Sequence, residues 1–199
     1  MSLRKLRIIA LRLAFAPVVF VAVFVRPSWG LESDIAFWVE LVGYLFLLAG
    51  LSVRIWCILY IGGRKSHELV TDGPYSLCRN PLYMGTFLLV VGAGLCFENV
   101  PMLILMAAVI VPAHVVVAKL EARHLAELFP TEYPAYAERV PMFWPRFSGY
   151  HSPSMIAVSA KSIRRIAVDT AAVILIPEIE DLLELLHEHH VMPVLWHWP

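Results

Sequence analysis

Charged residues are scarce in this sequence. They make up 16% of its 199 residues, whereas 59% are hydrophobic, and 16 basic residues balance 16 acidic ones to a formal net charge of zero. So low a charge content excludes an ordinary soluble domain and places the chain in the membrane class. A neutral chain also lacks the long-range attraction that draws proteins to nucleic acid, so we expect no nucleic-acid partner.

Cysteines are few as well. Cys57, Cys78 and Cys96 show no paired or metal-type spacing, which excludes a disulfide framework and a cysteine zinc site. The histidines near the carboxyl end fit no strong ligand spacing either, so we expect them to be solvated and predict no metal site; they are His187, His189, His190 and His197.

Long apolar runs are what the sequence does contain. Each of four runs approaches or exceeds the roughly 20 residues that cross a bilayer, and we expect them to form four core transmembrane helices. The first follows a basic start and leads into Arg26 and Pro27 rather than small residues, which favours a retained signal anchor. The fold class predicted is therefore an all-α integral membrane helical bundle, with spans at about 8–25, 35–61, 81–97 and 100–120.

Basic residues alternate between the segments that join these runs. The amino end holds three, the first loop one, the second loop three, the 98–99 hairpin none, and the chain from Lys119 onward seven. Because cytoplasmic loops carry the excess of Lys and Arg, a multi-pass topology with a cytoplasmic amino end is predicted. Arg12 and Arg54 fall within apolar runs, and we expect both to extend toward an interface, although Arg54 could also reach a polar cavity.

The pattern changes after Pro145. The apolar stretch 166–176 is short, Pro177 follows, and Ile179, Leu182, Leu183 and Leu186 then form one apolar stripe opposite acids. This part is either a kinked fifth span or a helix lying along the interface. We predict a membrane domain at 1–150 and a helical extension at 151–199.

A first polar cluster surrounds the start of the third run. Asn80 suits an N-cap and Pro81 the first helical turn, so the positive end of the helix would face the cytoplasmic interface and attract an anion. Arg79 adds a forked cation suited to a carboxylate or phosphate. The turn at 72–74 would bring Tyr75 back to the same place.

A second polar cluster follows the fourth run. Glu121 lies near the membrane edge, and Tyr133, Tyr136 and Arg139 follow on a predicted helical turn. Together the two clusters offer an anion site, a carboxylate and aromatic faces, which are the parts of a site for a zwitterionic, adenine-bearing ligand. The alternative is that these residues are ordinary topology signals and interfacial anchors.

The motifs resemble the isoprenylcysteine carboxyl methyltransferase and phospholipid methyltransferase superfamily. They are GluLeuValThrAspGlyProTyr at 68–75, ArgAsnProLeuTyrMetGly at 79–85, and Glu121, Leu125, Phe129, Glu132, Tyr133, Tyr136, Val140 and Pro141. The resemblance covers about 62–145 and implies a membrane enzyme that binds S-adenosylmethionine in a cytoplasmic pocket and methylates a lipophilic or lipidated acceptor reaching it from the lipid bilayer. It implies two cofactor-binding walls, formed by Tyr75, Arg79, Asn80, Pro81, Tyr83 and Gly85, and by Glu121, Tyr133, Tyr136 and Arg139.

The resemblance also implies roles. The helix mouth from Asn80 to Tyr83 would hold the methionine carboxylate, and Glu121 the ammonium or a ribose hydroxyl. Ala122 stands where the family has a second acid, Pro130 where it has a glycine, and Met142 where it has an arginine. These departures bear on the polar contacts of the second wall.

Methyl transfer requires no protein nucleophile, so we expect Cys78 to be a bystander. An amine acceptor would need a base, for which Glu121 and His124 are the candidates. The acceptor could be a carboxylate, an amine, a thiol or a phenol. Three other functions remain open: a phospholipid N-methyltransferase of the same superfamily, an NADPH-dependent sterol-type reductase, which shares similar motifs, and an inactive membrane adaptor.

Overall fold

The computed structural model describes residues 16–27, 34–62, 64 and 68–198. Residues 8–15 of the first predicted span lie outside these residues, as does Arg12. Four of the basic residues used in the topology count also lie outside them: Arg4, Lys5, Arg7 and Lys65.

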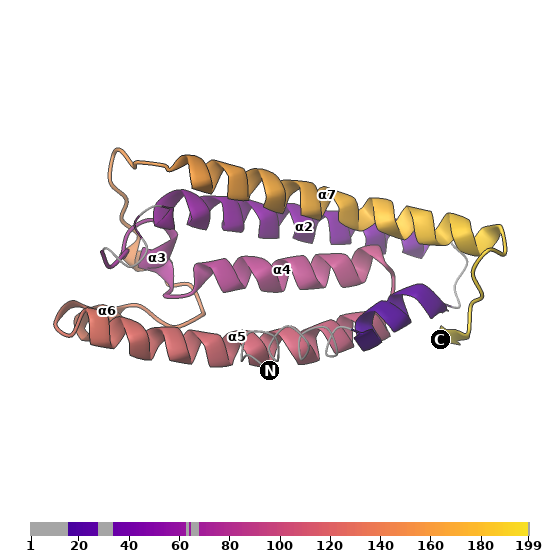
Figure 1. Ribbon diagram of the computed structural model, residues 1–199, viewed down its shortest axis with the longest axis horizontal. Helices are drawn as coiled ribbons and strands as arrows, with labels where there is room; N and C mark the ends of the chain where they lie inside the picture. The colour runs from indigo at the N-terminus through magenta and orange to yellow at the C-terminus, as the bar shows by residue number, and fades with distance from the viewer. Residues whose placement is uncertain (1–15, 28–33, 63, 65–67, 199) are drawn as a thin grey trace, which may run out of the picture. The chain divides into compact units, whose positions relative to one another are not determined.

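The described chain is mostly helical (Figure 1). Residues 16–24 form a helix that leads into the short strand β1 (Val25–Pro27). The long helix α2 (Asp34–Ile61) follows, and then the short helix α3 (Pro74–Leu77). After these come α4 (Pro81–Cys96), of intermediate length, and the long helix α5 (Val100–Leu128). The remaining elements are α6 (Glu132–Arg139), the 3-10 turn η1 (Phe147–Gly149), α7 (Ala160–Glu188) and β2 (Trp196–Trp198).

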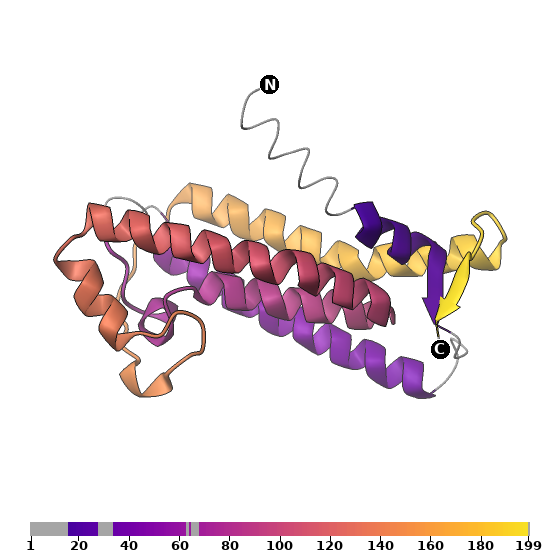
Figure 2. The same cartoon turned by 90° about the horizontal axis from the view of Figure 1, so that it is seen from below.

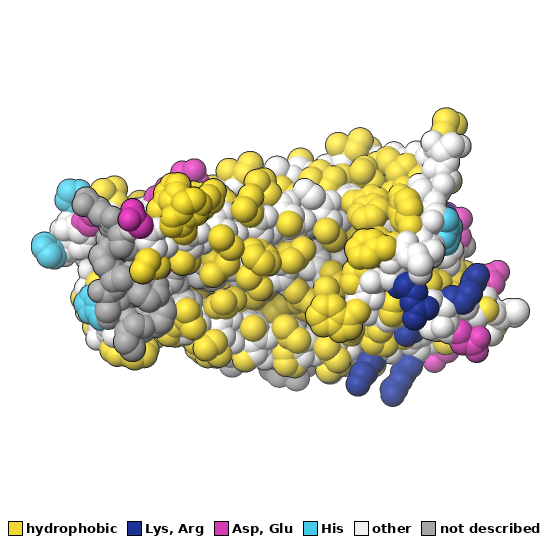
Figure 3. Space-filling view, turned by 180° about the vertical axis from the view of Figure 1, so that it is seen from behind, with side chains coloured by type: hydrophobic (Ala, Val, Ile, Leu, Met, Phe, Trp, Pro, Cys, Tyr) yellow, Lys and Arg dark blue, Asp and Glu magenta, His cyan; other side chains and the backbone are white. Residues whose placement is uncertain are grey.

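Two of the helices, α2 and α5, are long and apolar enough to cross a membrane. Many of their large side chains are exposed, among them Leu48, Ile104 and Val116, and hydrophobic side chains cover most of the face drawn in Figure 3. Apolar surface of this extent requires a nonpolar solvent, as in the bilayer. The protein is therefore a membrane protein.

The predicted spans correspond to helices to different degrees. Helices α2 and α5 correspond to the second and fourth runs, although α5 continues to Leu128, beyond the predicted end at 120. Helix α4 corresponds to the third run but has only 16 residues. A bundle of four core spans therefore stays a prediction.

Helix α7 contains Pro177 and the stretch 166–186, for which the sequence left open a kinked fifth span or a helix lying along the interface. It is one helix of 29 residues that runs through this proline, although a proline removes a backbone hydrogen bond from the helix interior. Its charged residues make it less apolar than α2 and α5, and it is not among the helices that are apolar enough to span. A small departure from the all-α prediction is the parallel pairing of β1 with β2, drawn as two arrows in Figure 2.

The chain forms two compact units. The first comprises Met1–Leu47, Val90–Pro112 and Ile174–Pro199, and the second comprises Leu48–Leu89 and Ala113–Val173. In the first unit, Asn99 is only 2% exposed: its Oδ1 accepts a hydrogen bond from the Met102 backbone N at 2.9 Å, and its Nδ2 donates to Val25 O at 2.8 Å. One side chain thus caps α5 and holds β1.

The second unit is organised around Arg54 of α2. Arg54 Nη1 donates to Thr86 Oγ1 on α4 at 2.9 Å, and the guanidinium forms a salt bridge with Asp169 on α7. Gly85 leaves the room that this arginine needs, because a Cβ there would lie 2.7 Å from Arg54 Cγ. Arg54 therefore pairs within the protein instead of extending to an interface.

Candidate functional site

A cavity in the second unit is lined by residues from both predicted polar clusters. Seven of the ten predicted site residues line it, namely Tyr75, Arg79, Asn80, Tyr83, Glu121, Tyr133 and Tyr136. The other three do not line it. Pro81 is buried at the start of α4, Gly85 lies against Arg54 and Gly50, and Arg139 lines a second cavity.

Direct hydrogen bonds join the two clusters across this cavity. Tyr83 on α4 donates from its hydroxyl to Glu121 Oε2 on α5 at 3.1 Å. Arg79 Nη1 donates to Tyr133 Oη of α6 at 3.3 Å. The residues are 38 and 54 positions apart in the sequence, so it is tertiary folding that builds this site.

The turn before α3 places Tyr75 in the cavity wall. Gly73 has a φ of 58°, and a Cβ at this position would lie 2.3 Å from the Tyr60 ring, so only glycine fits both the backbone and the contact. The Gly73 backbone N donates to His151 O at 2.8 Å. Tyr75 then belongs to a buried cluster with Cys57, Tyr60 and Val70.

The segment after α6 is fastened to the first cluster. The Arg79 backbone N donates to Pro141 O at 2.8 Å, and Asn80 Nδ2 donates to Met142 O at 3.1 Å. The Asn80 side chain thus holds this segment, and its backbone O accepts a hydrogen bond from the Met84 N in the first turn of α4. At about 1 kcal/mol each, such bonds stabilise one side of the cavity.

Two polar atoms of this site, Tyr75 Oη and Arg79 Nε, are buried and have no hydrogen-bond partner among the residues that the structure describes. Buried polar groups in proteins are nearly always satisfied, so donors of this kind beside a cavity are places where water or a ligand supplies the partner. Burial, with a contribution from the nearby Cys57 and Glu121, raises the pKa of Tyr75 well above its usual value. Its hydroxyl therefore remains a donor at neutral pH.

The thiol beside the site is unreactive. Cys78 is buried, and the loss of hydration raises its pKa to about 11, against an opposing effect of a hydrogen bond from the Asn80 backbone. A thiol that stays protonated at neutral pH is a poor nucleophile. This agrees with the expectation that Cys78 is a bystander.

Sequence reasoning missed an aromatic group next to this site. His114 of α5 lies edge-on to the ring of Tyr83, with 4.8 Å between ring centroids, and to Phe87 at 5.7 Å. His114 precedes Glu121 by seven residues, two helical turns, so both lie on the same face of α5. That spacing is the signal that could have identified it; His124, considered instead, is exposed.

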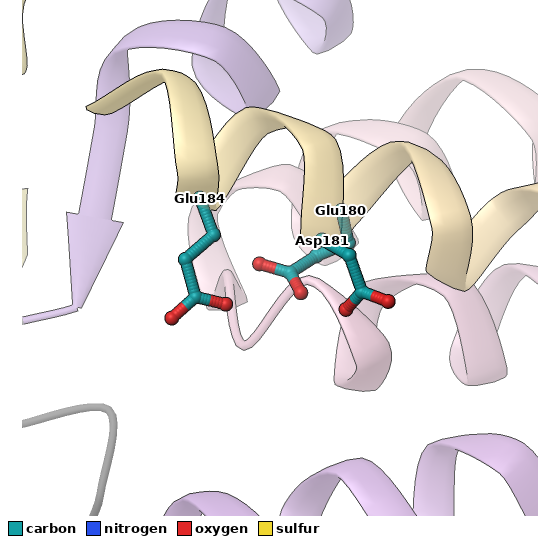
Figure 4. A group of neighbouring side chains, drawn as sticks. All are labelled: Glu180, Asp181 and Glu184. Atoms are coloured by element: carbon teal, nitrogen blue, oxygen red, sulfur yellow. The ribbon is translucent and has the colours of Figure 1, made fainter. Parts of the chain in front are cut away.

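Carboxylates gather elsewhere, in the first unit. Glu180, Asp181 and Glu184 of α7 lie close enough together to hold a metal ion (Figure 4). Glu180 forms a salt bridge with Arg26 at 2.8 Å, and Arg26 Nη2 lies 3.4 Å from His187 Nδ1. The guanidinium of Arg26 therefore partly neutralises the negative charge of these carboxylates.

Residues 38–132 match the family model described as phospholipid methyltransferase, a segment that contains α4, the whole of α5 and seven of the ten predicted site residues. The chain belongs to this family. In this chain, residues of the motifs at 68–85 and 121–141 meet at the cavity. The family membership agrees with the predicted resemblance and makes the protein a membrane methyltransferase by family.

Two curated relatives share 37% identity with the chain. One is the "Cobalt-zinc-cadmium resistance protein CzcN" of Cupriavidus metallidurans, aligned over 70% of this chain and 64% of the relative. The other is the "Nickel-cobalt-cadmium resistance protein NccN" of Alcaligenes xylosoxydans xylosoxydans, aligned over 77% of this chain and 71% of the relative. The match thus spans about two thirds of each relative, and no solved structure matches the chain significantly.

Proposed function

We propose that the protein is an S-adenosylmethionine-dependent methyltransferase that acts on a membrane-embedded or lipophilic acceptor. The observation that carries the proposal is the cavity of the second unit, where both motif regions meet and two buried donors, Tyr75 Oη and Arg79 Nε, await partners. Membership in the phospholipid methyltransferase family supports the same reaction class.

The residues present fit this cofactor. Arg79 and Asn80 provide donors for the methionine carboxylate, and Glu121 provides an acceptor for the ammonium group or a ribose hydroxyl. Apolar and aromatic side chains provide contacts for a flat ring; they are Ile61, Val70, Leu82, Ala118, Leu125, Tyr133 and Tyr136. Ala122, which replaces a family acid, contributes only a methyl group to this wall.

The cofactor would supply a methyl group on a sulfonium, ready for in-line displacement by the acceptor. The chain's own contribution is to align the acceptor and exclude water, so no protein nucleophile is needed. Glu121, already bonded to Tyr83, and the neighbouring His114 are the groups that could receive a proton from an amine acceptor.

Ligand binding tests this assignment. Purified protein in detergent is titrated with S-adenosylhomocysteine and with NADPH, and melting temperature and affinity are measured. We expect S-adenosylhomocysteine to bind, and Arg79→Ala to weaken it about tenfold or more, the loss expected for a charge-assisted hydrogen bond. His189→Ala, on the exposed carboxyl-terminal side of α7, is the control.

The result also separates the alternatives. Stabilisation by NADPH alone would favour the sterol-type reductase, and no response to either ligand would favour the inactive adaptor. Equal effects of Arg79→Ala and His189→Ala would contradict the placement of the site. Transfer of radiolabel from methyl-labelled cofactor to membrane lipids, followed by base treatment, distinguishes ester acceptors from amine or thioether acceptors.

We further propose a multi-pass topology with the amino end and the cavity on the cytoplasmic side, supported by the distribution of Lys and Arg. Reporter fusions after residues 30, 98 and 199 test it. A reporter at 98 that is active on the cytoplasmic side would contradict this orientation.

The names of the relatives suggest a physiological setting. Because both relatives are named as metal-resistance proteins, we propose that this protein also contributes to heavy-metal resistance, through methylation of a membrane component. Complementation of a metal-sensitive strain tests this: wild-type protein should restore growth on cadmium or cobalt, and Glu121→Gln should not.

A further inference from the structure

The second unit has another cavity, of about 210 Å³. It is lined chiefly by polar and basic side chains, which are Thr71, Ser76, Tyr136, Arg139, Arg146 and His151. Of the described residues, Tyr136 alone lines both cavities. Its hydroxyl donates to Tyr75 O at 2.7 Å, so its ring is held as a wall between them.

The chemistry of this lining favours an anion. Two guanidinium groups contribute to it, and its lining residues include no carboxylate. Arg139 Nε donates to Ala135 O at 3.2 Å, which leaves its terminal nitrogens available. The Arg146 side chain forms no salt bridge within the part of the chain that the structure describes. Forked guanidinium groups bind phosphate and carboxylate oxygens especially well.

Backbone contacts fix this lining before any ligand binds. The Arg146 backbone N donates to Leu77 O at 3.0 Å, and the His151 backbone N donates to Ser76 Oγ at 3.3 Å. The His151 ring also donates from Nδ1 to Gly149 O at 3.1 Å, which fixes the orientation of the ring. The cavity is several times the roughly 30 Å³ that one water molecule occupies in the liquid, so a tetrahedral oxyanion fits it.

Large exposed aromatic side chains lie close to Arg146 in the sequence. Trp144 is 80% exposed, Phe147 75% and Tyr150 51%, and these three residues flank Arg146 in the sequence. Exposed Trp and Tyr residues typically lie at the headgroup level of a bilayer. Arginine among such residues is placed to meet lipid phosphates.

We propose that this cavity binds the phosphate group of a phosphate ester, and that the aromatic segment 144–150 positions it at the level of lipid headgroups. The site is separate from the methyl-transfer cavity and does not depend on the identity of the methyl acceptor. A lipid held there would fix the depth of the second unit at the interface.

The test uses the full-length protein in detergent, with inorganic phosphate as one probe and phosphatidic acid in mixed micelles as the other. Diacylglycerol is the matched lipid control, because it lacks only the phosphate. The variant is Arg146→Gln, and the matched control is Arg164→Gln, which removes the same charge from an exposed position on α7. S-adenosylhomocysteine affinity is measured for every protein.

We expect Arg146→Gln to raise the apparent Kd for the phosphate probes about tenfold, the usual consequence of losing a charge-assisted hydrogen bond, while Arg164→Gln changes it little. S-adenosylhomocysteine affinity should be unchanged in both variants, and an unchanged melting temperature shows that they fold whether or not this ligand binds. Binding of phosphatidic acid but not of inorganic phosphate identifies a lipid headgroup as the source, and binding of both admits soluble phosphate esters.

Two outcomes would overturn the proposal. One is equal weakening by Arg146→Gln and Arg164→Gln, which would indicate general electrostatic attraction. The other is diacylglycerol and phosphatidic acid stabilising the protein equally while inorganic phosphate does not bind. Neither outcome affects S-adenosylhomocysteine binding, so this test fails or succeeds independently of the proposed activity.

Discussion

The hydroxyl of Tyr83 donates a hydrogen bond to Glu121 Oε2 across 3.1 Å and so joins α4 to α5 within the candidate cofactor cavity. Tyr83 belongs to the first motif cluster and Glu121 to the second. Their contact orients the carboxylate that we assign to the cofactor's ammonium or ribose.

Replacing this carboxylate tests its role. Glu121→Gln keeps the shape of the side chain but removes its charge, and we expect the affinity for S-adenosylhomocysteine to fall about tenfold. Tyr83→Phe should cost less, because it leaves the charge in place. Calorimetric titration measures both effects. Glu127→Gln, an exposed acid on the same helix, is the control, and an equal loss in that variant would argue against a specific contact.

A second prediction concerns the packing of Gly85. An added Cβ would lie 2.7 Å from Arg54 Cγ and 3.0 Å from Gly50 O, so Gly85→Ala should destabilise the protein by about 1–3 kcal/mol, as overpacking usually does. Gly149→Ala is the matched control, because the nearest atom to its Cβ would be 3.8 Å away. Melting temperatures measure the difference. If both variants melt alike, the close approach of α4 to α2 is not as the structure has it.

The salt bridge between Arg54 and Asp169 gives a third prediction. The two side chains are only 16% and 18% exposed. Removing one partner leaves a buried charge, so Asp169→Ala should destabilise the protein by about 3 kcal/mol or more. The double variant Arg54→Leu with Asp169→Leu should recover much of this loss.

Melting temperatures in detergent measure these effects. Glu178→Ala, an exposed acid on α7, should change little. If the double variant is no more stable than Asp169→Ala, the loss of stability does not come from the unpaired charge of Arg54.

The raised pKa of Cys78 gives a prediction on pH. Burial raises it from 9.0 to about 11 in the folded protein. The folded state holds its proton more tightly than the unfolded state, so this contribution to stability is present below pH 9 and is lost as pH rises to about 11. Denaturation curves of wild-type protein and Cys78→Ala should therefore converge over this interval. Parallel curves from pH 8 to 11 would contradict the shift.

The sequence was most informative where a signal was local. The bounds of α4 were predicted almost to the residue, because Asn80 and Pro81 mark its start and Glu98 and Asn99 follow its end. The end of α5 was missed by eight residues, since the polar stretch after Leu120 remains helical until the turn at Pro130. The sequence left open whether the chain kinks into a fifth span at Pro177 or forms an interfacial helix, because tertiary packing decides how a helix tolerates a proline.

The candidate site was also predictable from local signals and unpredictable where it depends on tertiary folding. Motif residues near the start of α4 and the end of α5 could be assigned to one pocket, and seven of ten line one cavity. Arg139 was placed in that pocket but lines the neighbouring cavity, because its position depends on how the segment after α6 folds back. Arg54 and Asp169 are 115 residues apart, and nothing in the local pattern of either residue predicts their pairing.

The salt bridge between Arg54 and Asp169 also limits how far the chain can be truncated from its carboxyl end. Arg54 lies against the glycine of the ArgAsnProLeuTyrMetGly motif, yet its counter-ion comes from α7, well downstream of the last motif residue. A truncated protein that ends at residue 150 would lack Asp169, the only salt-bridge partner of Arg54 among the described residues. We therefore expect a stable truncated protein to extend past Asp169.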